Sequence, residues 1–443
     1  MKYFGTDGIR QKADQFTPNF LANIVNGLVD YAGSQAKVLI GGDTRESTEW
    51  ILADLESALE TFGIEYGNVG VLPTPAICYC FHEMGFDFAI DVTASHNPYQ
   101  DNGIKIFEYR KDNTGKATSQ KLSDQGCEII EKHLASPQDY DLISPSLRED
   151  LHDEAVDLYK EHLLNYLESA DFSNLHIGMD CADGATSVIN KTIFEQLGAQ
   201  VELIHSDASY NRSINHDCGS THLESLIDLV KTHQLDFGIA FDGDGDRTLM
   251  VDANGNIVDG DDIIAILTNF LNLNQIAVTV MANQGLLNWA QANHIHAEIT
   301  PVGDSNVAAA MRNQNIPIGG EQSGHIILPG QPTGDGMLTA LMVTKIVAET
   351  GSTLSELASI ITKLPQVIVN LPATPAQKTT LATSDAVKDI ISHFEEKVKS
   401  VNGRLLVRPS GTENLIRITM WGDDEAKITQ LADSLSHELK STL

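Results

Sequence analysis

The stretch KVLIGGDTRES, residues 37–47, indicates how the first part of the chain folds. It joins an apolar run to a polar turn that contains glycine, and a helix-like stretch then runs to Leu59. The next segment, FGIEYGNVGVLPTP at 62–75, has the composition of a second strand. A strand, a helix and a second strand form a βαβ unit, which predicts a parallel sheet covered by helices.

The same order of elements occurs twice more along the chain. The second copy comprises LHIGMDCADGA (175–185), a helix-like stretch to Gln196, and LGAQVELI (197–204). The third comprises IAVTVMANQG (276–285), LLNWAQAN (286–293) and HIHAEITPVGD (294–304). The sequence therefore predicts an α/β protein with three related domains in tandem, built on parallel or mixed sheets.

The C-terminal part has a different pattern. LLVRPSGTENLIRITMW, at 405–421, indicates a strand, a tight loop and a strand. Apolar residues then recur at helical spacing, at Ile428, Leu431, Ala432, Leu435 and Leu439. We expect a smaller α+β domain here, and we place the four domains at 1–150, 151–253, 254–364 and 365–443. Because no low-complexity linker separates them, we expect the domains to pack around a shared site.

Composition and charge exclude several classes of protein. The 443 residues, 42% hydrophobic and 20% charged, are typical of a globular chain. With 61 acidic residues against 29 basic ones, the net charge of −32 argues against a nucleic-acid partner, which needs a basic face. An anionic substrate would require the few Arg and Lys residues to gather at its site.

Compartment is predicted from the apolar runs and the cysteines. We find neither an apolar run long enough to span a membrane nor the apolar core of a signal peptide, and we predict a cytoplasmic protein without a membrane partner. Five cysteines without a C-x-x-C pair disfavour zinc motifs and a disulfide framework. The sequence is compatible with a homodimer.

The first candidate loop is DVTASHNP, residues 91–98, which follows the strand-like FDFAI. Ser95 is either an ordinary turn residue, as Ser and Asn-Pro favour, or a nucleophile held at the end of a strand. His96 stands next to it. Taken alone, the loop favours the ordinary turn, and the rest of the chain has to support the nucleophile.

The second candidate loop is DGDGDR, which follows the strand Phe237–Phe241. Its glycines allow Asp242, Asp244 and Asp246 to converge on one hard cation, with Arg247 beside them. An EF-hand is disfavoured because its sixth and twelfth positions would hold Arg247 and Ala253. Since three uncompensated carboxylates would repel one another, a Mg²⁺ site fits better than a solvated turn.

Two further loops and two basic residues complete the candidates. Glu321, Ser323 and His325 in GGEQSGH suit the hydroxyls of a sugar, although a surface turn explains them equally well. The loop RPSGTEN offers an anion site whose candidate ligands are Arg408, Ser410, Gly411, Thr412 and Arg417. Arg10 and Lys105 are either surface charges or supports for a phosphate beside Ser95.

Taken in order, FGTDGIR, TASHNP, DGDGDR, GEQSGH and RPSGTE resemble the successive signatures of the α-D-phosphohexomutases over essentially the whole chain. The stretches YFGTDGIR, DCGSTH, GEQSGH, VDGDDII and PTGDGMLTAL are most similar to the bacterial phosphoglucosamine mutases of that family.

This resemblance implies four domains around a central cleft and a phosphoserine at Ser95. It implies Mg²⁺ held by Asp242, Asp244, Asp246 and the Ser95 phosphate. Catalytic roles would fall to Ser95, Arg10, His96, Lys105 and Arg247. The loop at 319–325 would bind the hydroxyl groups of the sugar. The loop at 408–417 would bind the phosphate that does not react.

The reaction implied interconverts glucosamine 6-phosphate and glucosamine 1-phosphate and supplies UDP-N-acetylglucosamine for cell-wall synthesis. Glucosamine 1,6-bisphosphate, or glucose 1,6-bisphosphate, would serve as intermediate or activator. The alternatives are a phosphomannomutase or phosphoglucomutase, a non-catalytic sugar-phosphate sensor, and a phosphatase that uses an aspartyl phosphate at Asp242.

Four positions depart from the usual pattern of the family. Gly42 and Ser305 stand where arginine is usual, Gln11 where glycine is usual, and Asn414 where proline is usual. We expect the missing arginines to lower activity or to alter substrate choice.

Overall fold

The computed structural model describes residues 2–5, 7–111, 115, 117–146, 150–410 and 414–443. The chain divides into two compact units, residues 1–279 with 298–359, and residues 280–297 with 360–443. Within the described residues, no helix combines the length and apolar character that a bilayer span needs. All five cysteines are free thiols and are buried.

The first sheet of unit 1 has the strand order β1-β2-β6-β5-β3-β4, and β7 pairs with β6. Its strands are β1 (Phe4–Gly5), β2 (Gly8–Lys12), β3 (Lys37–Gly42), β4 (Glu65–Val71), β5 (Phe88–Val92), β6 (Asp101–Lys111) and β7 (Ala117–Lys121). β3 is parallel to β4 and β5, whereas β6 is antiparallel to β5 and β2. The predicted βαβ unit is present, within a mixed sheet.

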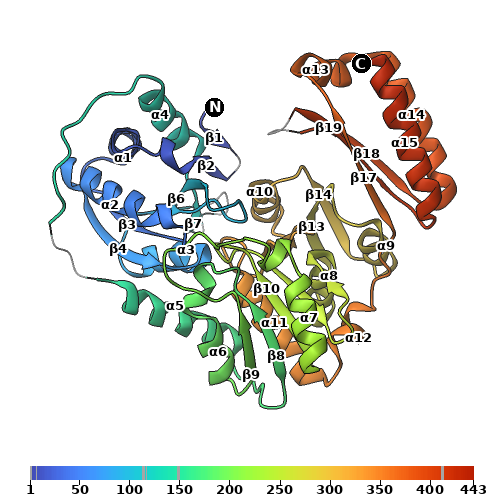
Figure 1. Ribbon diagram of the computed structural model, residues 1–443, viewed down its shortest axis with the longest axis horizontal. Coiled ribbons are helices and arrows are strands. Elements are labelled where there is room, and N and C mark those ends of the chain that lie inside the picture. The colour runs from blue at the N-terminus through green and yellow to red at the C-terminus, as the bar shows by residue number, and fades with distance from the viewer. Residues whose placement is uncertain (1, 6, 112–114, 116, 147–149, 411–413) are drawn as a thin grey trace. The chain divides into compact units, whose positions relative to one another are not determined.

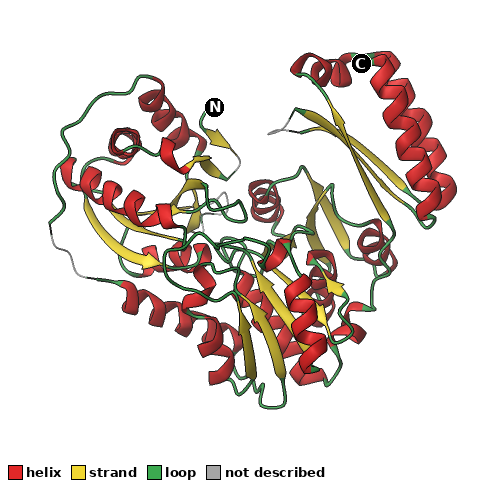
Figure 2. Ribbon diagram, in the orientation of Figure 1, coloured by secondary structure: helices red, strands yellow, loops and turns green. Residues whose placement is uncertain are grey.

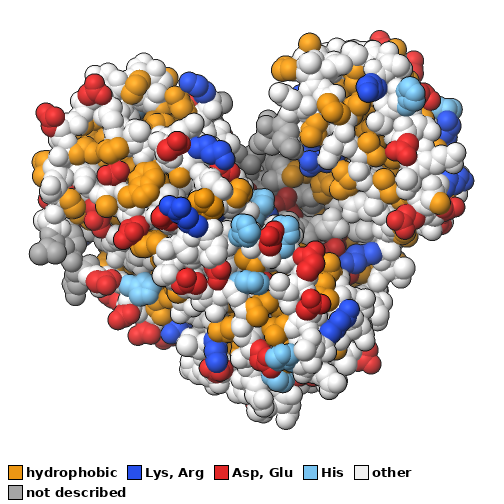
Figure 3. All heavy atoms as spheres, viewed as in Figure 1, with side chains coloured by type: hydrophobic (Ala, Val, Ile, Leu, Met, Phe, Trp, Pro, Cys, Tyr) orange, Lys and Arg blue, Asp and Glu red, His pale blue; other side chains and the backbone are white. Residues whose placement is uncertain are grey.

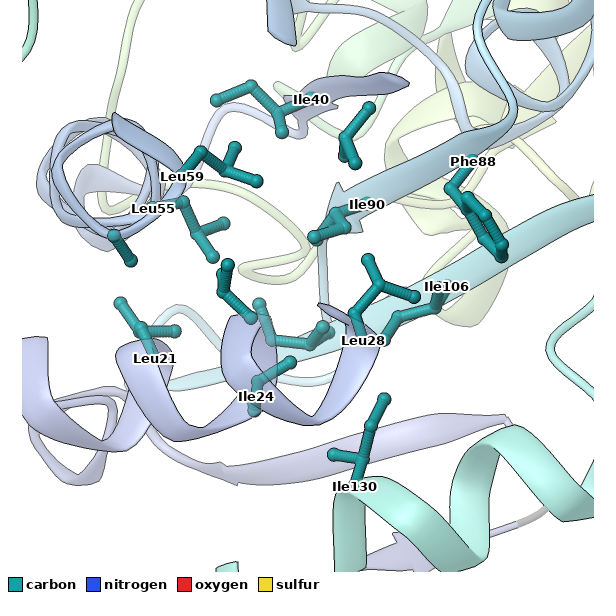
Figure 4. Close-up of a cluster of buried hydrophobic side chains, with 14 of the residues drawn as sticks. Leu21, Ile24, Leu28, Ile40, Leu55, Leu59, Phe88, Ile90, Ile106 and Ile130 are labelled. Atoms are coloured by element: carbon teal, nitrogen blue, oxygen red, sulfur yellow. The ribbon is translucent and has the colours of Figure 1, made fainter. Parts of the chain in front are cut away.

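Helices α1 (Pro18–Ala32), α2 (Glu46–Thr61), α3 (Thr74–Glu83) and α4 (Asp124–Ala135) accompany this sheet. Apolar side chains of α1, α2 and α4 meet those of β3, β5 and β6 in one buried cluster, shown in Figure 4. Leu28 of α1, Ile90 of β5 and Ile130 of α4 are members of this cluster. Burial of such side chains stabilises the sheet by roughly 1.5–3 kcal/mol each, and it fixes the strand ends that carry the loops.

The second sheet of unit 1 has the order β12-β11-β10-β8-β9. Its strands are β8 (His176–Asp180), β9 (Gln200–Ile204), β10 (Phe237–Phe241), β11 (Thr248–Asp252) and β12 (Ile257–Val258). Strand β8 is parallel to β9 and β10, as the second βαβ unit predicts, and β11 is antiparallel to β10. Helices α5 (His152–Leu167), α6 (Asn190–Gln196) and α7 (Glu224–His233) belong to this part of the chain.

The third sheet has the order β14-β13-β15-β16. Its strands are β13 (Gln275–Thr279), β14 (His296–Thr300), β15 (Ile318–Gly320) and β16 (Ile326–Ile327). Unit 1 also contains α8 (Gly260–Phe270), α10 (Asp304–Gln314), α11 (Gly336–Thr350) and α12 (Leu354–Ala358). The predicted helix between β13 and β14 is α9 (Gln284–Ala292), and it groups with unit 2.

Unit 2 contains an antiparallel sheet with the order β17-β19-β18. Its strands are β17 (Gln366–Pro372), β18 (Arg404–Pro409) and β19 (Leu415–Trp421), and its other helices are α13 (Pro375–Thr383), α14 (Asp385–Val398) and α15 (Glu425–Thr442). Helices α14 and α15 lie side by side beside the sheet (Figures 1 and 2). The predicted strand–loop–strand–helix order, and with it the smaller C-terminal domain, is confirmed.

Short 3₁₀ helices connect several of these elements, at Ala13–Gln15, Ala185–Val188, Gly219–Thr221 and Lys399–Val401.

Candidate active site

Ser95 is buried in the loop that follows β5. Its backbone has φ 53°, a left-handed conformation that is uncommon for residues other than glycine. The Ser95 amide donates to Thr93 Oγ1 at 2.9 Å, which supports this turn. Ser95 Oγ donates to Asp242 Oδ2 at 2.7 Å and lies 3.3 Å from His96 Nδ1. Ser95 therefore lies in a turn, and this turn points its hydroxyl toward the acidic loop.

Two side chains from other parts of the chain hold the carbonyl groups of this loop. Arg45, which is fully buried and paired with Asp43, donates to Ser95 O at 2.9 Å and to Asn97 O at 2.5 Å. Asn215 Nδ2 donates to the same two oxygens, at 2.9 and 3.2 Å. Each of these two carbonyl oxygens thus accepts from both side chains, which fixes the backbone of the serine loop.

The three aspartates of the second loop follow β10 and are buried together. A carboxylate oxygen from each of Asp242, Asp244 and Asp246 lies within 4.8 Å of the other two. Because β5 and β10 end in these two loops, Ser95 meets the triad although the two loops are far apart in the sequence.

Basic side chains on β6 and β2 lie near the triad. Lys105, on β6, lies with Nζ 2.7 Å from Asp244 Oδ2 and 3.0 Å from Asp246 Oδ2. The pairing of β2 with β6 sets Arg10 opposite Gly103, and Arg10 forms an ion pair with Asp7. Asp7 Oδ2 is in turn 3.4 Å from Lys105 Nζ.

Basic residues gather here in spite of the acidic surface. Acidic side chains lie all over the face seen in Figure 3, with fewer Lys and Arg among them. Among the residues that the structure describes, Arg45 and Lys105 are the cationic side chains that are buried, and both lie at this site. The expectation that the few basic residues would concentrate at one site is met for these two.

Burial and charge set the pKa values of the acidic loop. Burial raises the pKa of Asp242 well above its usual range, and the charges of Asp244 and Asp246 raise it further. For Asp244, burial is outweighed by the ammonium of Lys105, so its pKa lies below the ordinary value. Burial would lower the pKa of Lys105, but the surrounding carboxylates hold that pKa well above its usual range. Lys105 is therefore a fixed positive charge.

His96 and Arg247 complete this part of the site. Burial, with the positive charges of Arg247 and Arg10, lowers the pKa of His96 to about 3, so the imidazole is neutral at physiological pH. Arg247 Nε lies 3.8 Å from Asp242 Oδ2 and 3.7 Å from Asp246 Oδ1. Neighbouring carboxylates also raise the pKa of Arg247, although burial opposes this.

The oxygen donors of the acidic loop fit a hard cation. Asp244 Oδ1 and Asp246 Oδ1 are buried and have no hydrogen-bond partner within the described residues. Carboxylate oxygens that accept no hydrogen bond are costly to bury, and Mg²⁺ prefers carboxylate oxygens as ligands. The residues present therefore suit a divalent metal with oxygen ligands.

The loop that contains Glu321, Ser323 and His325 packs against the acidic loop. Arg247 and His325 form an antiparallel β-bridge, and the Thr248 amide donates to Gly324 O at 3.1 Å. The loop is closed by a bond from the Glu321 amide to His325 O at 3.0 Å. His325 is buried, whereas Glu321 and Ser323 are half-buried.

The fourth loop belongs to unit 2. Arg408 on β18 stands opposite Arg417 on β19, so the hairpin brings the two arginines together. Ser410 donates its amide to Leu415 O at 2.9 Å, and Lys378 Nζ donates to Ser410 O at 2.8 Å. Gly411 and Thr412 lie outside the described residues.

Four family models match successive parts of the chain. They are described as phosphoglucomutase/phosphomannomutase alpha/beta/alpha domain I at residues 1–132, domain II at 157–255, domain III at 259–364, and the C-terminal domain at 368–438. The chain belongs to the phosphoglucomutase/phosphomannomutase family.

Members of this family with curated names align over the full length. The phosphoglucosamine mutase of Caldicellulosiruptor bescii is 40% identical over 460 residues, covering 100% of this chain and 99% of the relative. The phosphoglucosamine mutase of Clostridioides difficile is 36% identical over 455 residues, with the same coverage.

Solved structures share the fold of the phosphoglucomutase/phosphomannomutase family at low identity. A putative phosphomannomutase from Thermus thermophilus superposes with a TM-score of 0.74 at 21% identity, covering 99% of this chain and 98% of that one. The N-acetylphosphoglucosamine mutase of Aspergillus fumigatus, solved with GlcNAc-6P and magnesium, has a TM-score of 0.64 at 18% identity, covering 98% and 95%.

The structure gives a local reason for one departure from the family pattern. A Cβ atom at Gly42 would lie 2.4 Å from Val92 O and 2.8 Å from Thr48 Cγ2, so this chain packs too closely for a side chain there. Ser305 is at the start of α10, beside Asp304, and Asn414 O accepts from the Ala373 amide at 2.9 Å. Nothing in the structure explains Gln11.

Several residues that contact the site were absent from the sequence prediction. Arg45 lies in the stretch GGDTR and Asp7 in FGTDGIR, so both residues belong to motifs that predict the site. Thr74 Oγ1 lies 2.7 Å from Asp244 Oδ2 and 2.6 Å from Asp91 Oδ2, and its single hydroxyl proton serves one of these carboxylates at a time. For Thr74 and Asn215 the sequence carries no such signal, because their role depends on packing between distant segments.

Proposed function

We propose that this protein is an isomerase that interconverts glucosamine 6-phosphate and glucosamine 1-phosphate, with Ser95 carried as phosphoserine. The observation that carries the proposal is the bond from the buried Ser95 hydroxyl to Asp242, within a triad that Lys105 partly neutralises. The full-length relatives named phosphoglucosamine mutase support the choice of an amino sugar.

The reaction transfers a phosphoryl group twice. Phosphoserine gives its phosphoryl group to a sugar hydroxyl, whose proton passes to a base, and a 1,6-bisphosphate forms. After the sugar reorients, the other phosphate returns to Ser95 and the isomer leaves. Phosphoryl transfer requires mainly positioning and charge stabilisation from the protein. Glucosamine 1,6-bisphosphate, or glucose 1,6-bisphosphate, would also phosphorylate Ser95 in an enzyme that has lost its phosphate.

We assign Asp242, Asp244, Asp246 and the Ser95 phosphate as ligands of Mg²⁺. When bound, this metal would neutralise the transferring phosphoryl group as a Lewis acid. The two buried carboxylate oxygens that accept no hydrogen bond, Asp244 Oδ1 and Asp246 Oδ1, support this assignment.

The remaining residues receive roles that fit their charge. The raised pKa of Lys105 suits charge stabilisation, as do the guanidinium groups of Arg10 and Arg247. Neutral His96, with Nδ1 3.3 Å from Ser95 Oγ, suits a hydrogen bond to the serine oxygen; its lowered pKa makes it a weak base, so the proton-handling role stays a prediction from the family resemblance.

The residues that would bind the sugar and its second phosphate are assigned from the family resemblance alone. Glu321, Ser323 and His325 would bind the sugar, and Arg408, Ser410, Gly411, Thr412 and Arg417 would hold the phosphate that does not react. The four domain boundaries and the cytoplasmic location remain predictions.

A coupled assay tests the substrate. Glucosamine, mannose and glucose phosphates are compared under identical conditions with excess Mg²⁺ and the matching bisphosphate. We expect glucosamine phosphate to turn over fastest. Faster turnover of mannose 1-phosphate would reassign the protein to a phosphomannomutase.

Phosphopeptide mapping tests the mechanism. After incubation with a sugar 1,6-bisphosphate, phosphate should appear on Ser95 and be absent from Ser95→Ala, which should also be inactive. Ser57→Ala, at a half-buried serine of α2, is the matched control. Phosphate on Asp242 would indicate a phosphatase-like mechanism, and no phosphate with no turnover would indicate a sensor.

A further inference from the structure

A second group of metal-ligating side chains lies in unit 1, outside the acidic triad. It consists of Asp180 at the end of β8, His205 just after β9, and Cys218 in the segment that leads to α7. One ligand atom from each of the three side chains lies within 4.8 Å of the other two. This group is called the Asp–His–Cys cluster below.

The distances fit one small cation. His205 Nδ1 and Asp180 Oδ2 are 3.0 Å apart. Zinc binds nitrogen, oxygen and thiolate ligands at about 2.0–2.3 Å, so two ligands of one zinc ion are at most about 4.6 Å apart. The three ligand atoms, all within 4.8 Å of one another, are therefore close to the spacing that one zinc ion requires.

Two of the three side chains of the cluster are buried, and the third is partly exposed. Asp180 and Cys218 are almost fully buried, whereas the side chain of His205 is 32% exposed, which leaves an entry for solvent. The thiol of Cys218 has a distant acceptor, Ser213 O at 3.9 Å. Asp180 Oδ1 accepts from the Ala182 amide at 2.9 Å, so that oxygen is fixed while Oδ2 faces the histidine.

We propose that the Asp–His–Cys cluster binds a zinc ion, with the Asp180 carboxylate, a ring nitrogen of His205 and the Cys218 thiolate as ligands and water in the fourth position. Carboxylate, imidazole and thiolate together are typical zinc ligands, in contrast to the all-oxygen triad. Binding releases the thiol proton of Cys218 to solvent, and no redox step is involved.

A metal here would act on the serine loop through the backbone. The Asn215 amide donates to Ala182 O at 2.9 Å, two residues from Asp180, and the Asn215 side chain holds Ser95 O and Asn97 O. Zinc would join the segment that carries Asn215 to the end of β8. This inference is independent of the substrate proposed above.

Metal titration of the chelator-treated full-length protein tests the site. Zinc binding is measured by calorimetry in excess Mg²⁺, which keeps the acidic triad occupied, and Co²⁺ is added separately to report thiolate coordination by its near-ultraviolet charge-transfer band. We expect one zinc per chain, the thiolate band, and a higher melting temperature with zinc.

Amino-acid substitutions test which residues bind the zinc ion. Cys218→Ser should remove the band and weaken zinc binding by roughly tenfold or more, whereas Cys127→Ser, at another buried free thiol, should leave both unchanged. If Cys218→Ser does not fold, His205→Gln, at the partly exposed position, tests the site instead. This variant should lose zinc affinity by the same factor. The proposal is overturned by absence of the band in the wild-type protein, or by wild-type zinc affinity in whichever variant folds.

Discussion

Ser95 Oγ donates a 2.7 Å hydrogen bond to Asp242 Oδ2, across 147 positions of sequence. The contact exists because β5 and β10 each end in a loop at this site, one with the serine and the other with the acidic triad. This contact brings the two loops together in one site, which contains the serine hydroxyl, three carboxylates and the buried ammonium of Lys105.

Replacement of Asp242 by asparagine should reduce turnover by about 10²–10³-fold, because one charged ligand beside the transferring group is lost. The expected loss is in kcat and in phosphoserine yield, with the fold retained by circular dichroism. Asp252→Asn is a matched control, since Asp252 is buried in the neighbouring strand β11 and its Oδ1 accepts from the amides of Asn254 and Asn256. Equal losses in the two variants would contradict the assignment.

Replacement of Arg45 by methionine should lower the free energy of unfolding by about 3–5 kcal/mol, because Asp43 would remain as an unpaired buried charge. Urea denaturation measures this change. Arg212→Met is the control, since Arg212 is 66% exposed and solvent screens its ion pair with Glu46, so this pair should contribute little to stability. A small loss at Arg45, similar to that at Arg212, would mean that the Asp43 pair contributes little.

Replacement of Asn215 by aspartate should disturb the serine loop with little change in backbone preference. Aspartate tolerates the left-handed conformation of this residue, φ 57°, but it cannot donate to Ser95 O and Asn97 O. We expect a loss of about 1–3 kcal/mol in stability and slower phosphorylation of Ser95. The control is Asn272→Asp, at an exposed position with φ 51°. Unchanged phosphorylation kinetics in Asn215→Asp would argue against a positioning role.

Asp335 should make stability fall as the pH rises. Burial raises its pKa to about 6, although its carboxylate accepts hydrogen bonds from the Leu338 amide and the Tyr159 hydroxyl. The folded state therefore holds the proton more tightly than the unfolded state, so the stabilisation is complete below about pH 4 and is lost as the pH passes through 6. The difference corresponds to about 3 kcal/mol.

Asparagine at 335 removes this titration, so Asp335→Asn should gain stability relative to the wild type between pH 4 and pH 7. Urea denaturation at a series of pH values measures the change. Asp385→Asn, at an aspartate that is 94% exposed, should run parallel to the wild type. A constant difference between Asp335→Asn and the wild type across this range would show that Asp335 is ionised throughout.

The sequence by itself determined the classes of element and the residues with chemistry to offer. The alternation of apolar runs, glycine-containing turns and helical stretches predicted the βαβ units, and β10 begins and ends at the predicted residues, Phe237–Phe241. Local patterns suffice there, because strand and helix periodicity and turn chemistry are properties of neighbouring residues. The motifs likewise identified the serine and the three aspartates.

Only the tertiary structure decided which of these residues meet. The buried pair of Arg45 with Asp43, the Asn215 bonds to the serine loop and the Lys105 contacts with the triad all join segments that are distant in the sequence or depend on packing around them. The Asp–His–Cys cluster is of the same kind, since its residues stand 25 and 13 positions apart along the chain. Such contacts follow from strand order and from close packing of the core, and neither is encoded in the spacing of residues along the chain.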